Sequence, residues 1–193
     1  MAPFKVAIVG GGMTGLTAAL HLDRIGIDFV LLEAYGDITP EVGASLAMYP
    51  NFQRVANQLG ILDDVRRESS ELRSLSCHDI EGKFMFEHHV ADDIHAATGG
   101  YGIATFTRAQ LLRILYRHIS EEGKKKIHTL KKVSRIEQLP GDEGVRLHIE
   151  GGETHDADVV IGADGTHSIV RSEMWRMAQE TDPKAFHDDQ GEG

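Results

Sequence analysis

The glycine-rich segment from Gly10 to Gly15 (Gly-Gly-Gly-Met-Thr-Gly) constrains the fold more than any other part of the sequence. It follows Val6 to Val9, a short apolar run typical of a strand buried on both faces. It also opens a Leu- and Ala-rich stretch with helical spacing, Met13 to Ile25, which Gly26 closes. This context gives the pattern G-x-G-x-x-G its weight, because the same glycines in a plain turn would indicate no ligand.

Each glycine of the pattern has a physical reason to be there. Gly10 allows the tight turn, Gly12 lets a pyrophosphate approach the backbone, and Gly15 lets the helix pack close to the sheet. The N–H groups at the helix start, at Met13 and Thr14, then face the phosphate charge. We therefore predict a dinucleotide-binding turn.

A second buried strand is expected from Asp28 to Glu33, which completes a βαβ unit. Glu33 ends this strand, where a carboxylate accepts hydrogen bonds from the ribose hydroxyls of adenosine. The same carboxylate would repel a 2′-phosphate, so the tightly bound nucleotide is expected to be FAD or NAD. The alternative for Glu33 is a solvated acid at a strand end.

The remaining chain predicts further helices, a hairpin and several strands. Helices are expected at Pro50 to Leu59, at Arg108 to Glu121 with Thr107 and Gln110 as a capping box, and at Ser168 to Met177. A hairpin is expected from Leu72 to His78 and Lys83 to His88. The other expected strands are Lys126 to Leu130, Val133 to Gln138, Val145 to Ile149, Thr154 to Ala157 and Val159 to Gly162, with a loop at Pro140 to Gly144.

The composition of the chain limits the classes of partner and the compartment that it suits. The 193 residues carry a formal net charge of −10, which argues against nucleic acid or an anionic membrane surface. Cys77 is the single cysteine, expected half-buried on a strand, and it suits a reducing compartment. No run of the sequence is apolar for long enough to suggest a signal peptide or a membrane span, so a cytoplasmic location is expected. The histidines follow no recognised metal-ligand spacing, so no metal site is expected.

Three further segments, with the glycine-rich turn, carry a family resemblance. Asp158 to Arg171 (Asp-Val-Val-Ile-Gly-Ala-Asp-Gly-Thr-His-Ser-Ile-Val-Arg) resembles the Asp-Gly motif of class A flavoprotein monooxygenases, the p-hydroxybenzoate hydroxylase-like group. Val42 to Asn51 resembles the segment of that group beside the ribityl chain and flavin, and Phe106 to Leu112 its arginine-led helix. Within this group, the sequence Glu33-Ala34-Tyr35 is similar to that of fungal secondary-metabolite hydroxylases and epoxidases.

The resemblance implies roles for individual residues. Arg108 would reach towards FAD, near the pyrophosphate or the ring, where a guanidinium suits phosphate oxygens; the alternative is a surface ion pair. Asp164 would help to hold FAD and support NAD(P)H use; a turn aspartate that caps the following helix is the alternative, and both roles can coexist. Gly43 and Ala47 would lie against the flavin, where small residues admit close backbone. Many relatives have glycine at the position of Ala47.

The fold class expected is α/β, a Rossmann-like FAD-binding domain of the glutathione-reductase kind. We expect it to span residues 1–177, with an inserted antiparallel β region at about 72–106, the strands from Lys126 to Ala157 packed on the dinucleotide core, and a polar, flexible tail at 178–193. Enzymes of the group run to about twice this length and return with a second Gly-Asp motif that this sequence lacks, so the C-terminal half of the usual fold is expected to be missing.

The function implied is an FAD-dependent monooxygenase, in which NAD(P)H is the transient reductant and O₂ oxygenates a small apolar natural-product intermediate. Two alternatives stay open: a shortened flavoprotein that works as a non-redox isomerase or cyclase, and a non-catalytic remnant. Oxygen transfer needs a reaction site shielded from water, and a partial shell would leave apolar surface uncovered. A homodimer could complete the missing wall. The sequence names no catalytic acid or base.

Overall fold

The computed structural model describes residues 4–182, with only the backbone described at Val90 and Asp142. It divides into two compact units: residues up to Ile38 together with those from Ile119 form unit 1, and Thr39–His118 form unit 2. The FAD-binding domain expected over residues 1–177 includes residues of both units, and the antiparallel region expected at about 72–106 lies within unit 2. The expected tail at 178–193 lies outside the described residues beyond Asp182, while its first residues are helical.

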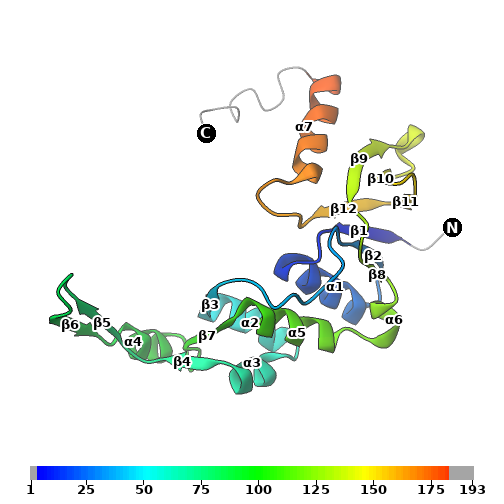
Figure 1. The fold of residues 1–193 in the computed structure, drawn as a ribbon. Helices are drawn as coiled ribbons and strands as arrows, with labels where there is room; N and C mark the ends of the chain where they lie inside the picture. Colours follow the sequence, from blue (N-terminus) through cyan, green and yellow to red (C-terminus); the bar gives the residue numbers. More distant parts are fainter. Residues whose placement is uncertain (1–3, 183–193) are drawn as a thin grey trace. The chain divides into compact units, whose positions relative to one another are not determined.

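Unit 1 carries the βαβ turn (Figure 1). Its elements in chain order are β1 (Lys5–Val9), α1 (Met13–Ile25), β2 (Asp28–Leu32), α6 (Glu121–Lys124), β8 (Ile127–His128), β9 (Val133–Gln138), η1 (Pro140–Asp142), β10 (Val145–Ile149), β11 (Thr154–Ala157), β12 (Val159–Gly162) and α7 (Ile169–Thr181). A parallel sheet has the order β12-β1-β2-β8, and an antiparallel sheet has the order β11-β10-β9.

The core of unit 1 joins the two sheets. Val9 and Leu32 of the parallel sheet share a buried cluster with Ile136, Leu147 and other residues of the antiparallel sheet. After their first residues, Lys5 and Asp28, β1 and β2 are buried throughout, which explains why the rest of each strand is apolar. The expectation that the strands from Lys126 to Ala157 pack on the dinucleotide core is confirmed.

Unit 2 is built around a short antiparallel sheet with helices beside it (Figure 1). Its elements are β3 (Ser45–Met48), α2 (Pro50–Gln58), α3 (Leu62–Glu68), β4 (Ser70–Leu72), β5 (Leu75–His78), β6 (Phe84–His88), α4 (Val90–Ala97), β7 (Ile103–Thr107) and α5 (Arg108–His118). The sheet order is β3-β7-β4, and β5 and β6 pair as a separate hairpin. That hairpin is exposed along both strands and projects from the rest of the unit.

Several expected boundaries are corrected by local backbone chemistry. The helix expected to reach Glu121 ends at His118, because the hydroxyl of Ser120 accepts a hydrogen bond from the Gly123 amide and starts α6 instead. The strand expected from Lys126 to Leu130 shortens to Ile127–His128, since Leu130 has a φ of 57°, which an extended strand does not allow.

Other corrections concern the ends of the chain segments around the hairpin and α7. The expected strand from Leu72 to His78 is split between β4 and β5. The helix expected to end at Met177 continues to Thr181. Cys77 lies on β5 as expected, but it is exposed and not half-buried, because the hairpin has no layer of described residues over it.

Candidate functional site

The glycine-rich turn joins β1 to α1 and lies against the Ala163-Asp164 segment after β12. Gly10 has a φ of 101°, which glycine adopts without strain. A Cβ placed on Gly10 would lie 2.5 Å from the carbonyl oxygen of Ala163 and 2.9 Å from the Cα of Asp164. Glycine at this position is therefore required both by the turn and by the close approach of a neighbouring backbone.

Gly15 is required for a different reason. A Cβ on Gly15 would lie 1.9 Å from the carbonyl oxygen of Gly10 and 3.5 Å from the Cβ of Ala163. No real pair of atoms tolerates the first distance, so only glycine lets α1 lie this close to the turn and the strand ends. This geometry is the close helix–sheet packing expected from the sequence.

The N-terminus of α1 is free of side chains that would compete with an anion. Gly12 is the N-cap residue, no side chain caps the helix, and the first turn carries no acidic residue. The first backbone N–H groups of the helix, at Met13 and Thr14, have no partner within the helix. Together with the partial positive charge of the helix end, they make a site suited to a phosphate group.

Glu33 is positioned beside this turn, just after β2. Its Oε2 accepts a hydrogen bond from the amide of Gly11 at 2.5 Å, and its Oε1 accepts one from the amide of Tyr35 at 2.8 Å. A carboxylate offers about four acceptor positions, so two contacts leave capacity for the two hydroxyls of a ribose. The structure thus shows a held carboxylate at the turn rather than a solvated acid at a strand end.

Asp164 caps α7. Its Oδ1 accepts a hydrogen bond from the Ser168 hydroxyl at 2.6 Å, and its Oδ2 accepts from the amides of Ile169 at 2.7 Å and Val170 at 3.2 Å. The capping alternative weighed for this residue therefore describes its side chain in the structure. A role towards FAD stays a prediction, and it rests on the position of the Asp164 backbone beside Gly10.

In unit 2, Gly43 and Arg108 lie together. Gly43 has a φ of 127°, and a Cβ there would come within 3.0 Å of the Arg108 Cδ. The amide of Arg108 donates to the carbonyl of Ala44 at 3.1 Å, while Arg113 forms an ion pair with Glu41. The segment before β3 is thus held against the start of α5.

The Arg108 side chain has no hydrogen bond or ion pair with the described residues, so the surface ion pair weighed as an alternative is not what the structure shows. Ala47 is exposed on β3 and pairs with Thr105 of β7. The expected site residues therefore fall into two groups. Gly10, Gly12, Met13, Thr14, Gly15, Glu33 and Asp164 belong to unit 1, and Gly43, Ala47 and Arg108 belong to unit 2.

Sequence reasoning missed the backbone contacts of Glu33 with β8 and with the residues just after it. The carbonyl of His128 accepts from the Glu33 amide at 2.8 Å, and the Lys131 amide donates to the Glu33 carbonyl at 2.8 Å. Burial lowers the pKa of His128, with a further contribution from the charge of neighbouring His155, and this favours the uncharged form of His128. The sequence indicated a strand from Lys126 to Leu130, but backbone hydrogen bonds leave no side-chain signal, so the contacts of this segment with Glu33 were not indicated.

The described residues 4–182 contain no cluster of His, Cys, Asp and Glu that could hold a metal ion, and no helix among them is long and apolar enough to cross a membrane.

Comparisons with known proteins agree on one family. The family model described as "FAD binding domain" matches residues 3–185. An FAD-dependent monooxygenase of Metarhizium robertsii, subE, is 41% identical over 175 residues, which are 90% of this chain and 53% of that protein. An FAD-dependent monooxygenase of Aspergillus flavus, atmM, is 38% identical over 180 residues, 93% of this chain and 36% of that protein. The chain thus spans about half, or less, of these relatives.

Solved structures give the same result at the level of the fold. HpxO of Klebsiella pneumoniae, crystallised with FAD and uric acid, superposes with a TM-score of 0.73 at 26% identity, over 87% of this chain and 41% of that one. A tetrameric 2-methyl-3-hydroxypyridine-5-carboxylic acid oxygenase superposes with a TM-score of 0.72 at 26% identity, over 90% of this chain and 43% of that one.

Proposed function

Because this chain belongs to the family of FAD binding domains, we propose that unit 1 holds the ADP part of FAD and that the chain supplies the front portion of an FAD-dependent monooxygenase. The observation that carries this proposal is the uncapped start of α1 behind the Gly10 turn, with Glu33 fixed beside it. A nucleotide needs both features, a place for the pyrophosphate and an acceptor for the ribose.

Different residues of unit 1 would bind the pyrophosphate and the ribose of FAD. The amides of Met13 and Thr14 would donate to pyrophosphate oxygens, and Glu33 would accept from the ribose hydroxyls. Glycine at positions 10 and 15 keeps the turn and helix at the required distance. Bound FAD would supply the redox chemistry, accepting electrons from NAD(P)H and passing them to O₂.

In unit 2, Arg108 would bind the anionic part of the cofactor. Its guanidinium has no ion pair among the described residues, and Gly43 leaves room for its side chain. A permanent positive charge with several donors suits phosphate oxygens. Gly43 and Ala47 would admit the flavin close to the backbone. These assignments rest on the sequence motifs and on the local geometry of each unit.

The substrate we propose is a small apolar natural-product intermediate, hydroxylated or epoxidised with NAD(P)H and O₂. The names of the curated relatives support a monooxygenase, and their length supports a whole enzyme larger than this chain. A non-redox isomerase or cyclase, or a remnant without catalysis, is distinguished by the experiment below. The monooxygenase would work in the cytoplasm.

We also propose that a second copy of this chain covers the β5–β6 hairpin. Leu75, Phe84 and Phe86 are each exposed by half or more, at 52%, 56% and 50%. Leu75 pairs with His88 and Cys77 with Phe86, so one face of the hairpin carries Leu75, Cys77 and Phe86. An apolar face with the same residues on each copy can pack on itself about a two-fold axis.

Sedimentation velocity should show a dimer that Phe86→Ser dissociates. A monomer at all concentrations contradicts the proposed dimer.

The function is tested by the visible spectrum of the purified chain loaded with FAD. The proposal expects an oxidised-flavin band that NADPH bleaches and air restores. Flavin that binds but is not reduced by NADPH would favour the non-redox alternative. A chain that takes up no flavin would contradict the proposal and favour a remnant.

A further inference from the structure

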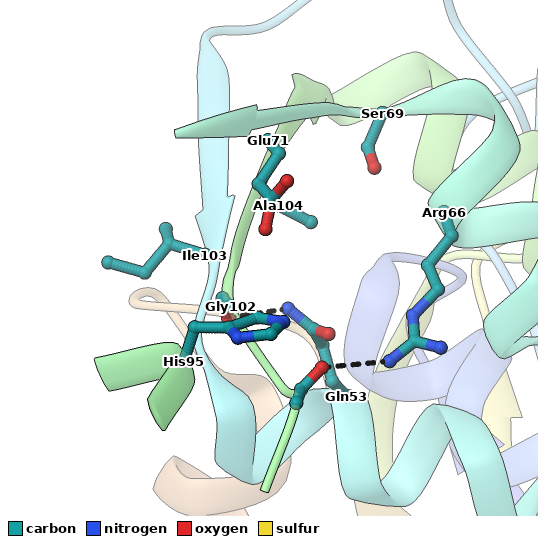
Figure 2. Close-up of a pocket in the computed structure, with 9 residues that line it drawn as sticks. Gln53, Arg66, Ser69, Glu71, His95, Gly102, Ile103 and Ala104 are labelled. Atoms are coloured by element: carbon teal, nitrogen blue, oxygen red, sulfur yellow. Dashed lines mark hydrogen bonds between the residues drawn. The ribbon is translucent and has the colours of Figure 1, made fainter. Parts of the chain in front are cut away.

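A polar cavity of about 340 Å³ lies within unit 2, apart from every residue assigned above to FAD. Its walls come from α2, α3, β4, α4 and β7 (Figure 2). This volume falls within the usual range of small-molecule sites. Its lining is not that of an apolar pocket, because it includes the side chains of Arg66, Glu71 and His95.

The floor of the cavity is fixed by Gln53, which is 3% exposed. Its side-chain amide donates to the carbonyls of Gly102 at 2.8 Å and Met48 at 3.3 Å. A Cβ on Gly102 would lie 2.9 Å from the Glu71 Oε1 and 3.6 Å from the His95 Cδ2, so a side chain there would displace the Glu71 carboxylate. The glycine thus leaves the space that the Glu71 carboxylate occupies beside His95.

The cationic wall is also held in place. Arg66 donates from Nη2 to the carbonyl of Gly100 at 3.1 Å, and its guanidinium lies 5.7 Å from the ring centroid of Tyr101. The fixed guanidinium keeps donors for a ligand. Figure 2 shows Arg66 on one side of the cavity and Glu71 with His95 on the other.

The anionic wall opens to solvent: Glu71 and His95 are exposed, as is Arg66 opposite them, and Ser69 is half-buried, so their polar groups are accessible to water or to a ligand. Within residues 4–182, the side chains of Glu71, His95 and Ser69 make no hydrogen bond or ion pair with one another or with any other residue. Three polar side chains that converge on one cavity without protein partners, opposite a fixed guanidinium, are suited to a ligand with charges of both signs.

We propose that this cavity binds a small zwitterion of the α-amino-acid type, with its carboxylate on Arg66 and its ammonium on Glu71. The carboxylate–guanidinium pair can form two parallel hydrogen bonds, and a carboxylate with free lone pairs accepts from an ammonium. Ile103 and Ala104 supply the apolar part of the lining. The proposal is independent of FAD binding, so a failure of one leaves the other untouched.

The test uses the ¹⁵N-labelled chain and three probes that share the isobutyl group of leucine. L-leucine carries both charges, 4-methylpentanoate only the carboxylate and 3-methylbutylamine only the ammonium. We expect L-leucine to shift the amide signals of Ser69 to Glu71 and of Gly100 to Ala104 in a saturable manner. Each single-charge probe should bind at least about tenfold more weakly, which corresponds to about 1.4 kcal/mol. The absence of saturable shifts, or equal binding of 4-methylpentanoate, overturns the proposal.

Two variants test which residue binds each charged group of the ligand. Glu71→Gln and Arg66→Gln should each weaken L-leucine at least about tenfold. Glu81→Gln, at the exposed hairpin turn, and Arg73→Gln make the same charge changes elsewhere and should leave binding unaltered. If a cavity variant loses its dispersed spectrum, Gly102→Ala serves instead, because its methyl group displaces the Glu71 carboxylate. Unchanged affinity in folded variants overturns the proposal.

Discussion

The carboxylate of Glu33 and the amide of Gly11 are joined by a hydrogen bond of 2.5 Å, which ties the end of β2 to the glycine-rich turn. The second oxygen of the same carboxylate accepts from the Tyr35 amide. Strand end and turn are thereby fixed in relation to one another before any nucleotide arrives, and this relationship leads to the first prediction.

Glu33→Gln should weaken FAD binding about tenfold, or about 1.4 kcal/mol, because a carboxamide has one oxygen and cannot accept from both amides and the ribose. Titration of FAD, followed by quenching of flavin fluorescence, measures the change. Glu122→Gln, an exposed acid paired with Lys125, is the matched control and should bind as the wild type does. Equal affinity of Glu33→Gln and wild type would show that Glu33 has no part in the site.

Gly15→Ala should destabilise the fold by about 3 kcal/mol, because the new methyl group would meet the Gly10 carbonyl oxygen and force α1 away from the turn. Urea unfolding followed by circular dichroism measures it. Gly36→Ala is the control, since a Cβ there lies 3.4 Å from a Leu130 methyl group, an ordinary contact. If both variants unfold at the same urea concentration, the close packing at Gly15 is not real.

Asp164→Asn and Ser168→Ala separate the two roles considered for Asp164. Each removes part of the cap of α7 and should cost about 1 kcal/mol of unfolding free energy. FAD affinity should fall further in Asp164→Asn than in Ser168→Ala if the aspartate also serves the cofactor. Equal FAD affinities in the two variants would assign Asp164 to capping alone.

Arg108→Gln should lower FAD affinity at least tenfold, a loss of about 1.4 kcal/mol, while leaving the melting temperature near that of the wild type. The reason is that its guanidinium makes no ion pair among the described residues. Arg113→Gln on the same helix breaks the ion pair with Glu41 and is the control, expected to leave FAD binding unaltered. Paired calorimetric titrations and thermal melts give both quantities. A large loss of stability with normal affinity in Arg108→Gln would contradict the assignment.

The free energy of unfolding is expected to depend on pH through the carboxyl group of Asp64. The hydrogen bond from His118, with that from Arg117, holds the pKa of Asp64 below its ordinary value of 3.8. A lowered carboxyl pKa stabilises the folded state above the unfolded pKa, and this contribution is lost as the pH falls through the folded value. Asp64→Asn should therefore cost about 1 kcal/mol at pH 7 and less at pH 2, where the carboxylate becomes protonated in the wild type.

The measurement is urea unfolding of the Asp64→Asn variant and the wild type at both pH values. Asp63→Asn, which changes the neighbouring acid in the same first turn of α3, is its control. A difference between Asp64→Asn and wild type that persists at the lower pH would contradict this origin.

The elements that sequence could predict are those with their own local signal. The helix from Met13 to Ile25 and the strands Val133–Gln138 and Val145–Ile149 have the expected bounds, because apolar periodicity and terminal glycines mark them. By contrast, Ser45–Met48 was not identified as a strand. It is four residues long and largely exposed, and only its pairing with β7 makes it extended.

The candidate site divides along the same line. Glycine at positions 10 and 15 could be predicted, because backbone sterics dictate this residue type in the turn, while the role of Glu33 towards a ribose stays a prediction. The commitment of the Asp164 carboxylate to α7 depended on where Ser168 and Ile169 fold back. The cavity beside Gln53 is lined by residues of five elements of unit 2, and no residue spacing along the chain predicts it.

The most direct test of the account is an equilibrium titration of the purified 193-residue chain with FAD, followed by its visible spectrum and fluorescence. The account predicts saturable binding of one FAD per chain, with a flavin spectrum altered from that of free FAD. No saturation at FAD concentrations on the order of 1 mM, which corresponds to a binding free energy weaker than about 4.1 kcal/mol, would contradict it.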